Sequence, residues 1–170
     1  MGPIGHTAIA FAAKRVAPRV PLLALIVATE ILDLLTYVFL ALGIESLGAS
    51  RTDLASGVVM QVPASIPWSH GLLMALVWSS LAAVIGLLSF RDRRSAAIIG
   101  LLVLSHWILD FVVHPRELPL LLQGSPLLGL CLWCSGPGLL AAGILEFALF
   151  AFGLGLYLSY RKSQAGPQRA

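Results

Sequence analysis

The stretch from residue 105 to residue 115 carries the pattern with the most chemical potential in this sequence. His106, Asp110 and His114 follow one another at intervals of four residues, within an otherwise apolar run. An α-helix turns about 100° per residue, so these three side chains project from one stripe of one helix. Imidazole nitrogens and carboxylate oxygens are the ligands that zinc and similar divalent ions take. The spacing therefore predicts metal ligands on a helix that ends near Pro115.

Further ionisable residues interrupt apolar stretches elsewhere in the chain. Glu30 and Asp33 lie three residues apart and share a helix face. One of them is expected to bind a metal and the other to act as a base or as a supporting partner. His6 lies in a short apolar segment near residue 1, where a polar group is tolerated best if it points into a wet cavity. Insertion scales put the cost of an ionisable group in the membrane at about 2.5–3.5 kcal/mol, which makes each a candidate for function.

The depth of the carboxylates gives an independent argument. At about 1.5 Å per residue, Asp33, Asp110 and Glu146 all lie roughly 20 Å from the same side of their apolar stretches. No Lys or Arg lies inside these stretches, so a cation shared between the carboxylates would offset most of the cost of burying them. The alternative is a purely structural polar network, and Glu146 in particular fits a structural role as well as a functional one.

Composition sets the class of protein. Hydrophobic residues make up 58% of the 170 residues and charged residues 11%, against about 25% charged in a soluble domain. This excludes a soluble enzyme, a nucleic-acid binder and a disordered chain. A helix needs about 20 apolar residues to cross the bilayer. Four stretches are long enough: 20–43, 71–90, 95–113 and 138–160. We predict an all-α polytopic membrane helix bundle forming one domain over 1–170, with four transmembrane helices plus a short N-terminal half-helix at 4–13.

The basic residues predict the orientation of these spans. Three precede the first span, three separate the second from the third, and three follow the fourth: Lys14, Arg15 and Arg19; Arg91, Arg93 and Arg94; Arg161, Lys162 and Arg169. The positive-inside rule then places both termini in the cytoplasm. The connections at 44–70 and 114–137 face outward. The second holds Cys131 and Cys134, which suit a redox pair, a disulfide, half a metal site or, as we favour, two structural cysteines.

Four segments together resemble a known family. They are Gly5-His6-Thr7-Ala8-Ile9-Ala10, Leu32-Asp33-Leu34-Leu35, Pro67-Trp68-Ser69-His70-Gly71-Leu72, and Ser105-His106-Trp107-Ile108-Leu109-Asp110 continuing to His114-Pro115. They resemble the bacterial inner-membrane proteins classed as metal-dependent hydrolases, a family distantly similar to the zinc-dependent phospholipase C and nuclease group. The resemblance implies a location in the bacterial inner membrane. It also implies a metal surrounded by His6, Asp33, His70, His106, Asp110 and His114.

Three functions fit these observations. The first is a membrane-embedded hydrolase in which a divalent ion, zinc above all, activates a water, with Asp33 or Glu30 accepting its proton. Its substrate would be an amphiphile such as a lipid ester or phosphoester. The second is a transporter that binds a cation or a proton, which needs polar residues continuing toward the cytoplasm. The third is a non-catalytic membrane protein with a structural metal. The expected partners are membrane lipids.

Overall fold

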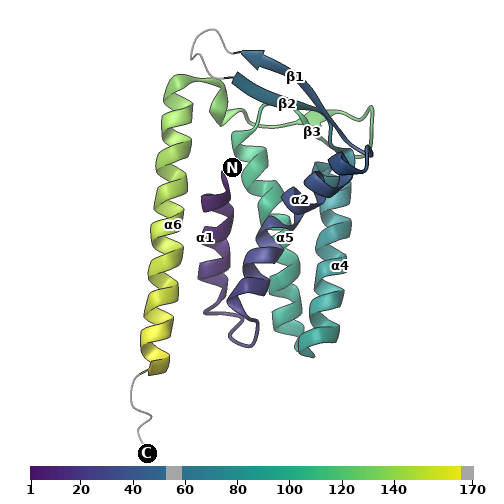
Figure 1. The fold of residues 1–170 in the computed structure, drawn as a ribbon. Helices are drawn as coiled ribbons and strands as arrows, with labels where there is room; N and C mark the ends of the chain where they lie inside the picture. Colours follow the sequence, from purple (N-terminus) through teal and green to yellow (C-terminus); the bar gives the residue numbers. More distant parts are fainter. Residues whose placement is uncertain (53–58, 166–170) are drawn as a thin grey trace, which may run out of the picture.

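The computed structural model describes residues 1–52 and 59–165, and it confirms an all-α bundle (Figure 1). Its helices are α1 (Pro3–Ala13), α2 (Leu22–Ala41), α3 (Pro67–His70), α4 (Leu72–Phe90), α5 (Arg93–Val113) and α6 (Gly136–Ala165). α1 packs against α6 and α2, while α5 lies between α2 and α4.

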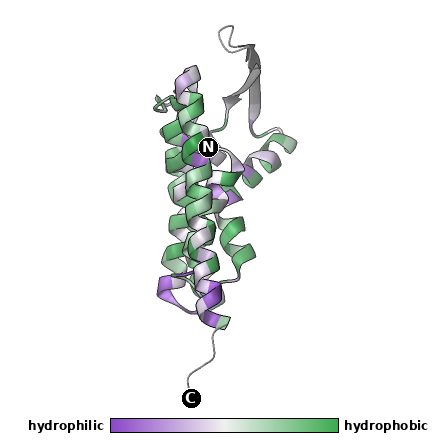
Figure 2. Cartoon of the chain, turned by 90° about the vertical axis from the view of Figure 1, so that its left-hand side faces the viewer, coloured by the Kyte–Doolittle hydropathy of each residue, from purple (hydrophilic) through white to green (hydrophobic). Residues whose placement is uncertain are grey.

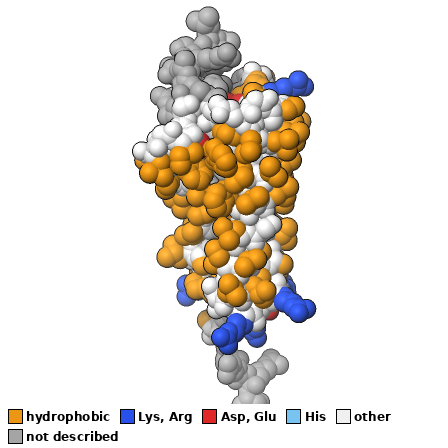
Figure 3. Space-filling view, turned by 90° about the vertical axis from the view of Figure 1, so that its right-hand side faces the viewer, with side chains coloured by type: hydrophobic (Ala, Val, Ile, Leu, Met, Phe, Trp, Pro, Cys, Tyr) orange, Lys and Arg blue, Asp and Glu red, His pale blue; other side chains and the backbone are white. Residues whose placement is uncertain are grey.

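Four of these helices, α2, α4, α5 and α6, are long and apolar enough to cross a membrane. They match the four predicted spans to within a few residues, which is consistent with a multi-pass membrane protein. Hydrophobic residues dominate along the helices, and hydrophilic residues gather where the helices end (Figure 2). A belt of hydrophobic side chains also covers the face that Figure 3 shows.

Most of the Lys and Arg residues that the structure describes gather at one end of the bundle, which we call the basic end; Figure 3 shows several of them there and one patch of the same colour near the opposite end. The basic end comprises the loop between α1 and α2, the turn between α4 and α5, and the last turns of α6, with Lys14, Arg15, Arg19, Arg91, Arg93, Arg94, Arg161 and Lys162. The exposed side chain of Arg19 and the half-buried side chain of Asp92 approach to 3.9 Å and join two of these segments. Arg169 lies outside the described residues.

The helix α1 is the predicted half-helix. Its 11 residues give a length of about 16 Å, roughly half of the hydrocarbon thickness. It begins inside the bundle and runs toward the basic end (Figure 1). The first residue, Met1, is therefore buried within the bundle rather than placed at the basic end, which differs from the position expected for the N-terminus.

Local sequence explains where several helices begin and end. Pro3 and Pro67 occupy first turns, where the missing N–H is not needed. Asp92 caps α5 by accepting a 3.0 Å hydrogen bond from the Ser95 amide. Hydrogen bonds from the Ser95 hydroxyl and amide hold the pKa of the Asp92 carboxyl below its ordinary value. α5 ends just before Pro115, as predicted.

The connection between α2 and α3 and the one between α5 and α6 contain short strands that the sequence did not predict. In the first, β1 (Ser46–Thr52) pairs antiparallel with β2 (Val59–Ser65), and the pairing is irregular between Ser46 and Ser50. In the second, β3 (Leu118–Pro119) pairs with β4 (Leu127–Leu128), and the 3₁₀ helix η1 (Leu132–Cys134) follows. We call this end of the molecule the loop end; it lies opposite the basic end (Figure 1).

The contact between α1 and α6 depends on a glycine. A Cβ atom built at Gly153 would overlap the backbone oxygen of Ala8, whereas one built at Gly155 meets nothing within 4 Å. The backbones of the two helices therefore meet directly at Gly153, as small residues allow in membrane bundles.

We predict that Gly153→Ala destabilises the protein, because backbone atoms must move to admit the added methyl group. The expected loss is about 1–3 kcal/mol, the usual range for overpacking, seen as a lower melting temperature of the detergent-purified protein. Gly155→Ala, on the same helix, is the matched control and should melt like the wild type. Equal melting of the two variants would contradict the proposed close contact.

Candidate metal centre

Four imidazole rings converge on the carboxylate of Asp110, which is buried on α5. His106 Nε2 lies 3.2 Å and His70 Nε2 lies 3.4 Å from Oδ2 of Asp110. His6 Nε2 lies 3.3 Å and His114 Nε2 lies 3.7 Å from Oδ1. Each oxygen of this one carboxylate thus faces two imidazole nitrogens, which come from three different helices and the residue that follows α5.

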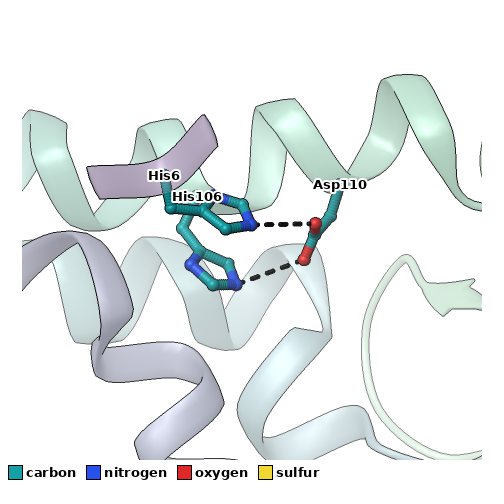
Figure 4. A group of neighbouring side chains, drawn as sticks. All are labelled: His6, His106 and Asp110. Atoms are coloured by element: carbon teal, nitrogen blue, oxygen red, sulfur yellow. Dashed lines mark ion pairs between the residues drawn. The ribbon is translucent and has the colours of Figure 1, made fainter. Parts of the chain in front are cut away.

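Asp33 on α2 completes the cluster. Its Oδ1 lies 3.4 Å from His70 Nε2 and 3.5 Å from His106 Nε2. Two groups of three residues have ligand atoms within 4.8 Å of one another, namely Asp33 with His70 and His106, and His6 with His106 and Asp110. Figure 4 shows the second group. These buried His and Asp groups can hold a metal ion, and both groups use His106.

In two of these imidazoles, Nδ1 points away from Asp110 and is hydrogen-bonded to an oxygen that can act only as an acceptor. His106 Nδ1 lies 2.6 Å from the carbonyl oxygen of Thr29, and His114 Nδ1 contacts a carboxylate oxygen of Glu117. The proton in each pair must therefore reside on Nδ1. In the neutral ring, Nε2 then carries a lone pair, and that lone pair faces Asp110.

His70 also carries its proton on Nδ1. Its Nδ1 lies 3.0 Å from the Thr36 hydroxyl and 3.1 Å from the Ser69 hydroxyl. Thr36 already donates its hydrogen to the Leu32 carbonyl oxygen, and Ser69 donates to the Glu45 carboxylate. A hydroxyl has one hydrogen, so both hydroxyls accept from Nδ1–H. The Nε2 lone pair of His70 is therefore left to face Asp33 and Asp110.

When the three rings are neutral, three imidazole lone pairs and two carboxylates share one space, and these groups repel one another unless a positive charge lies between them. His106 Nε2 is buried and has no hydrogen-bond partner. The amino group of Met1 contacts Oδ1 of Asp110, but no Lys or Arg side chain forms an ion pair with Asp33 or Asp110 in the described part of the chain. A divalent metal fits this donor set, since neutral imidazole and carboxylate are its ordinary ligands and each ring's other nitrogen is already hydrogen-bonded.

His6 stands apart from the other three histidines. Its Nε2 lies 3.0 Å from the carbonyl oxygen of Met1, and its buried Nδ1 has no partner. The ring stacks on that of His106, with centroids 3.8 Å apart and planes 9° from parallel. The amino group of Met1 also contacts Oδ1 of Asp110. His6 therefore reaches the cluster without the Nδ1 hydrogen bond that the other three rings have, and its Nε2 faces a carbonyl oxygen that can only accept.

Burial shows where the cluster is accessible. His6, His70, His106 and Asp110 are buried, whereas 37% of the Asp33 side chain is exposed. The 24% exposure of the His114 side chain makes it the second most accessible member. The cluster is thus closed on most sides and opens where Asp33 lies on α2.

The remaining predicted residues lie beside the cluster. Glu30 is half-buried one turn before Asp33 and accepts a 3.1 Å hydrogen bond from the Thr7 hydroxyl of α1. Glu146 on α6 accepts a 3.0 Å hydrogen bond from the Gly5 amide. The Gly5 amide also bonds to the Gly2 carbonyl oxygen, and a carboxylate at the first turn of a helix interacts favourably with the helix dipole. This contact favours the structural alternative for Glu146, which holds α1 in place next to His6.

Glu45 is a residue that the sequence analysis missed. Only 4% of it is exposed. Its carboxylate accepts hydrogen bonds from the Trp68 amide at 2.9 Å, the Ser69 amide at 2.9 Å and the Ser69 hydroxyl at 2.8 Å. It lies in a connection expected to be a loop, so no periodic pattern marked it. Glu117 was missed as well, although its position three residues after His114 was a usable signal.

The two cysteines form a disulfide, Cys131–Cys134, one of the alternatives that their spacing allowed. The bridge encloses Trp133, whose ring packs on that of His114 with centroids 4.6 Å apart. The amide of Cys131 donates a 2.8 Å hydrogen bond to the His114 carbonyl oxygen. The cysteines therefore contribute to the packing around His114 rather than to a second metal site.

No protein-family model matches this chain, and neither a curated protein nor a solved structure matches it at a significant level. The family suggested by the four sequence segments thus stays a prediction. The candidate metal centre is the feature of the chain that bears on its function.

We predict that removing metal lowers the stability of the protein, because the carboxylates and lone pairs would lose the charge between them. Metal at a hundred times its Kd adds about 2.7 kcal/mol to the stability of the folded state. The melting temperature should fall in chelator and recover when zinc is added back. Asp33→Asn, which weakens the donor set at its exposed side, should respond much less. Identical melting of the wild type with and without chelator would contradict this prediction.

Proposed function

We propose that the protein is a membrane-embedded metal-dependent hydrolase that acts on a lipid or phosphoester substrate. The observation that carries the proposal is the convergence of anchored imidazole lone pairs from His70, His106 and His114 on Asp110 and Asp33. Nitrogen and oxygen ligands of this kind favour zinc. An open position beside the ligands distinguishes catalytic zinc sites from structural ones, and the exposure of Asp33 supports such a position.

The two carboxylates of α2, Asp33 and Glu30, are assigned different roles in the proposed hydrolysis. A divalent ion held by this cluster would supply an activated water, because it lowers the pKa of water from about 15.7 toward 7. Asp33 contacts two of the imidazoles and is best suited to bind the ion. Glu30 forms no ion pair with an imidazole in the described part of the chain and accepts a hydrogen bond from Thr7. We assign Glu30 the role of the general base that accepts the proton of the water.

The depth of the cluster supports an amphiphilic substrate. Asp33 lies 11 residues into α2, which is about 17 Å along the helix axis, and the hydrocarbon layer is about 30 Å thick. The exposed side of Asp33 therefore opens within the bilayer. A lipid can present an ester or phosphoester group there by moving laterally, with its chains remaining in the hydrocarbon.

The distribution of buried polar groups argues against a transporter. Among the buried polar residues that the structure describes, Thr29 and Ser95 lie toward the basic end from the cluster. Their hydroxyls bond to the Ile26 carbonyl oxygen and to Asp92, respectively. A conduction path needs polar residues on both sides of the membrane midplane. The one-sided cluster suits a reaction chamber with a single opening. The proposed orientation puts the basic end in the cytoplasm of a bacterium and the protein in its inner membrane.

We predict that the purified wild type carries about one divalent ion per chain, measured by elemental analysis. His106→Ala, Asp110→Ala and Asp33→Asn should each lose most of it. Glu146→Gln is the matched control, because that carboxylate bonds an amide of α1 and faces no imidazole in the described contacts; it should keep its metal. Negligible metal in the folded wild type would overturn the proposed site.

We predict that Glu30→Gln keeps the metal and loses turnover, by about 10²–10⁴-fold, the usual contribution of a general base. Glutamine still accepts the Thr7 hydrogen bond, so the fold should be intact. Release of phosphate-bearing or fatty-acid products from mixed phospholipid micelles, with and without chelator, is the measurement. A metal-loaded protein that hydrolyses no ester or phosphoester lipid would favour the structural-metal alternative.

A further inference from the structure

We propose that Glu45 is a positioning residue that acts through Ser69 to keep the proton of His70 on Nδ1, so that Nε2 is free to bind metal. The inference rests on the proposed metal centre and adds a residue outside the ligand set. Its basis is a continuous chain of contacts from the Glu45 carboxylate to the Ser69 hydroxyl at 2.8 Å and from that hydroxyl to His70 Nδ1 at 3.1 Å.

Glu45 is held rigidly at the start of α3. Both of its oxygens are used: Oε1 accepts from the Trp68 and Ser69 amides, and Oε2 accepts from the Ser69 hydroxyl. The amides belong to the first turn of α3, whose N–H groups have no partner within the helix. The carboxylate therefore caps this short helix and, by the same contact, fixes the direction of the Ser69 hydroxyl.

The direction of that hydroxyl decides which nitrogen of His70 carries the proton. A carboxylate only accepts, so the Ser69 hydrogen points to Glu45 and the Ser69 oxygen accepts from His70 Nδ1–H. Were the hydroxyl to turn around, it would donate to Nδ1, and the proton of the neutral ring would move to Nε2. A protonated Nε2 cannot bind a metal, because its lone pair is occupied.

The Nδ1 atoms of His70, His106 and His114 thus have different kinds of hydrogen-bond partner. A backbone carbonyl holds His106, the Glu117 carboxylate holds His114, and hydroxyls hold His70. A hydroxyl can donate or accept, so it fixes the proton only if another group fixes the hydroxyl. Thr36 is fixed by the Leu32 carbonyl oxygen, and Ser69 is fixed by Glu45. His70 is therefore the ring whose proton position a change in Glu45 can alter.

Glu45→Gln tests this with a minimal change of shape. The amide oxygen of glutamine can still accept from the two α3 amides, but its NH₂ group then faces the Ser69 oxygen. The Ser69 oxygen would then accept a hydrogen bond from that NH₂ group, and the Ser69 hydroxyl could donate its hydrogen to His70 Nδ1. We expect zinc affinity to fall by about 10–100-fold, the usual effect of losing a partner behind a metal ligand. Competition with a chromophoric zinc chelator measures it.

A second readout reports the proton directly. In metal-free protein labelled with ¹⁵N-histidine, at a pH where the ring is neutral, nitrogen chemical shifts distinguish Nδ1–H from Nε2–H. We expect His70 to carry its proton on Nδ1 in the wild type and to shift toward Nε2–H in Glu45→Gln. The matched control is Glu146→Gln, which also replaces a carboxylate that accepts a backbone amide but has no contact with His70. It should leave both readouts unchanged.

Ser69→Ala provides a variant that leaves the Glu45 cap on the α3 amides in place. Thr36 then remains the sole acceptor for Nδ1–H, so the proton should stay on Nδ1 while zinc affinity falls less than in Glu45→Gln. Wild-type zinc affinity retained in both Glu45→Gln and Ser69→Ala would overturn the inference. A wild type that binds no zinc would overturn the proposed function instead, and the nitrogen shifts would still decide whether Glu45 sets the proton on His70.

Discussion

The structure depends on one electrostatic constraint: lone pairs and negative charges from several helices share a small buried space. Asp110 is at its centre, with imidazole nitrogens on both of its oxygens. In a medium of low dielectric, unpaired charges of this kind are expensive, whereas a cation between them makes the same arrangement favourable. The groups that share this space come from α1, α2, α3, α5 and the residue that follows α5.

The fold satisfies the constraint with elements that are unusual in a simple helix bundle. α1 is too short to cross a membrane, and this lets its first turn enter the bundle at the depth of the cluster. α3 is a single turn, between Pro67 and Gly71, that brings His70 in from the loop end. Glu146 and Glu45 each bond amides at the start of one of these elements, so two carboxylates outside the cluster hold the helices that supply its histidines.

The packing around the cluster leaves it accessible from one side. Apolar side chains such as Leu25, Leu102 and Val103 fill the bundle between the cluster and the basic end. Near the loop end, the Cys131–Cys134 disulfide and Trp133 pack around His114. Access remains at Asp33, on the side of α2 that faces the surroundings of the bundle. This exposure on one side would suit the proposed reaction on a membrane-dissolved substrate.

The sequence by itself determined the number and position of the long helices and the stripe of His106, Asp110 and His114, because hydrophobic length and helical periodicity are local properties of the chain. Equal depth along separate spans also predicted that Asp33 would approach Asp110. The tertiary structure alone decided that Glu146 bonds to an amide in the first turn of α1 and that Glu45 bonds to Ser69 beside His70. Those contacts join residues far apart in the chain, and a single hydrogen bond between distant residues leaves no periodic signal in the sequence.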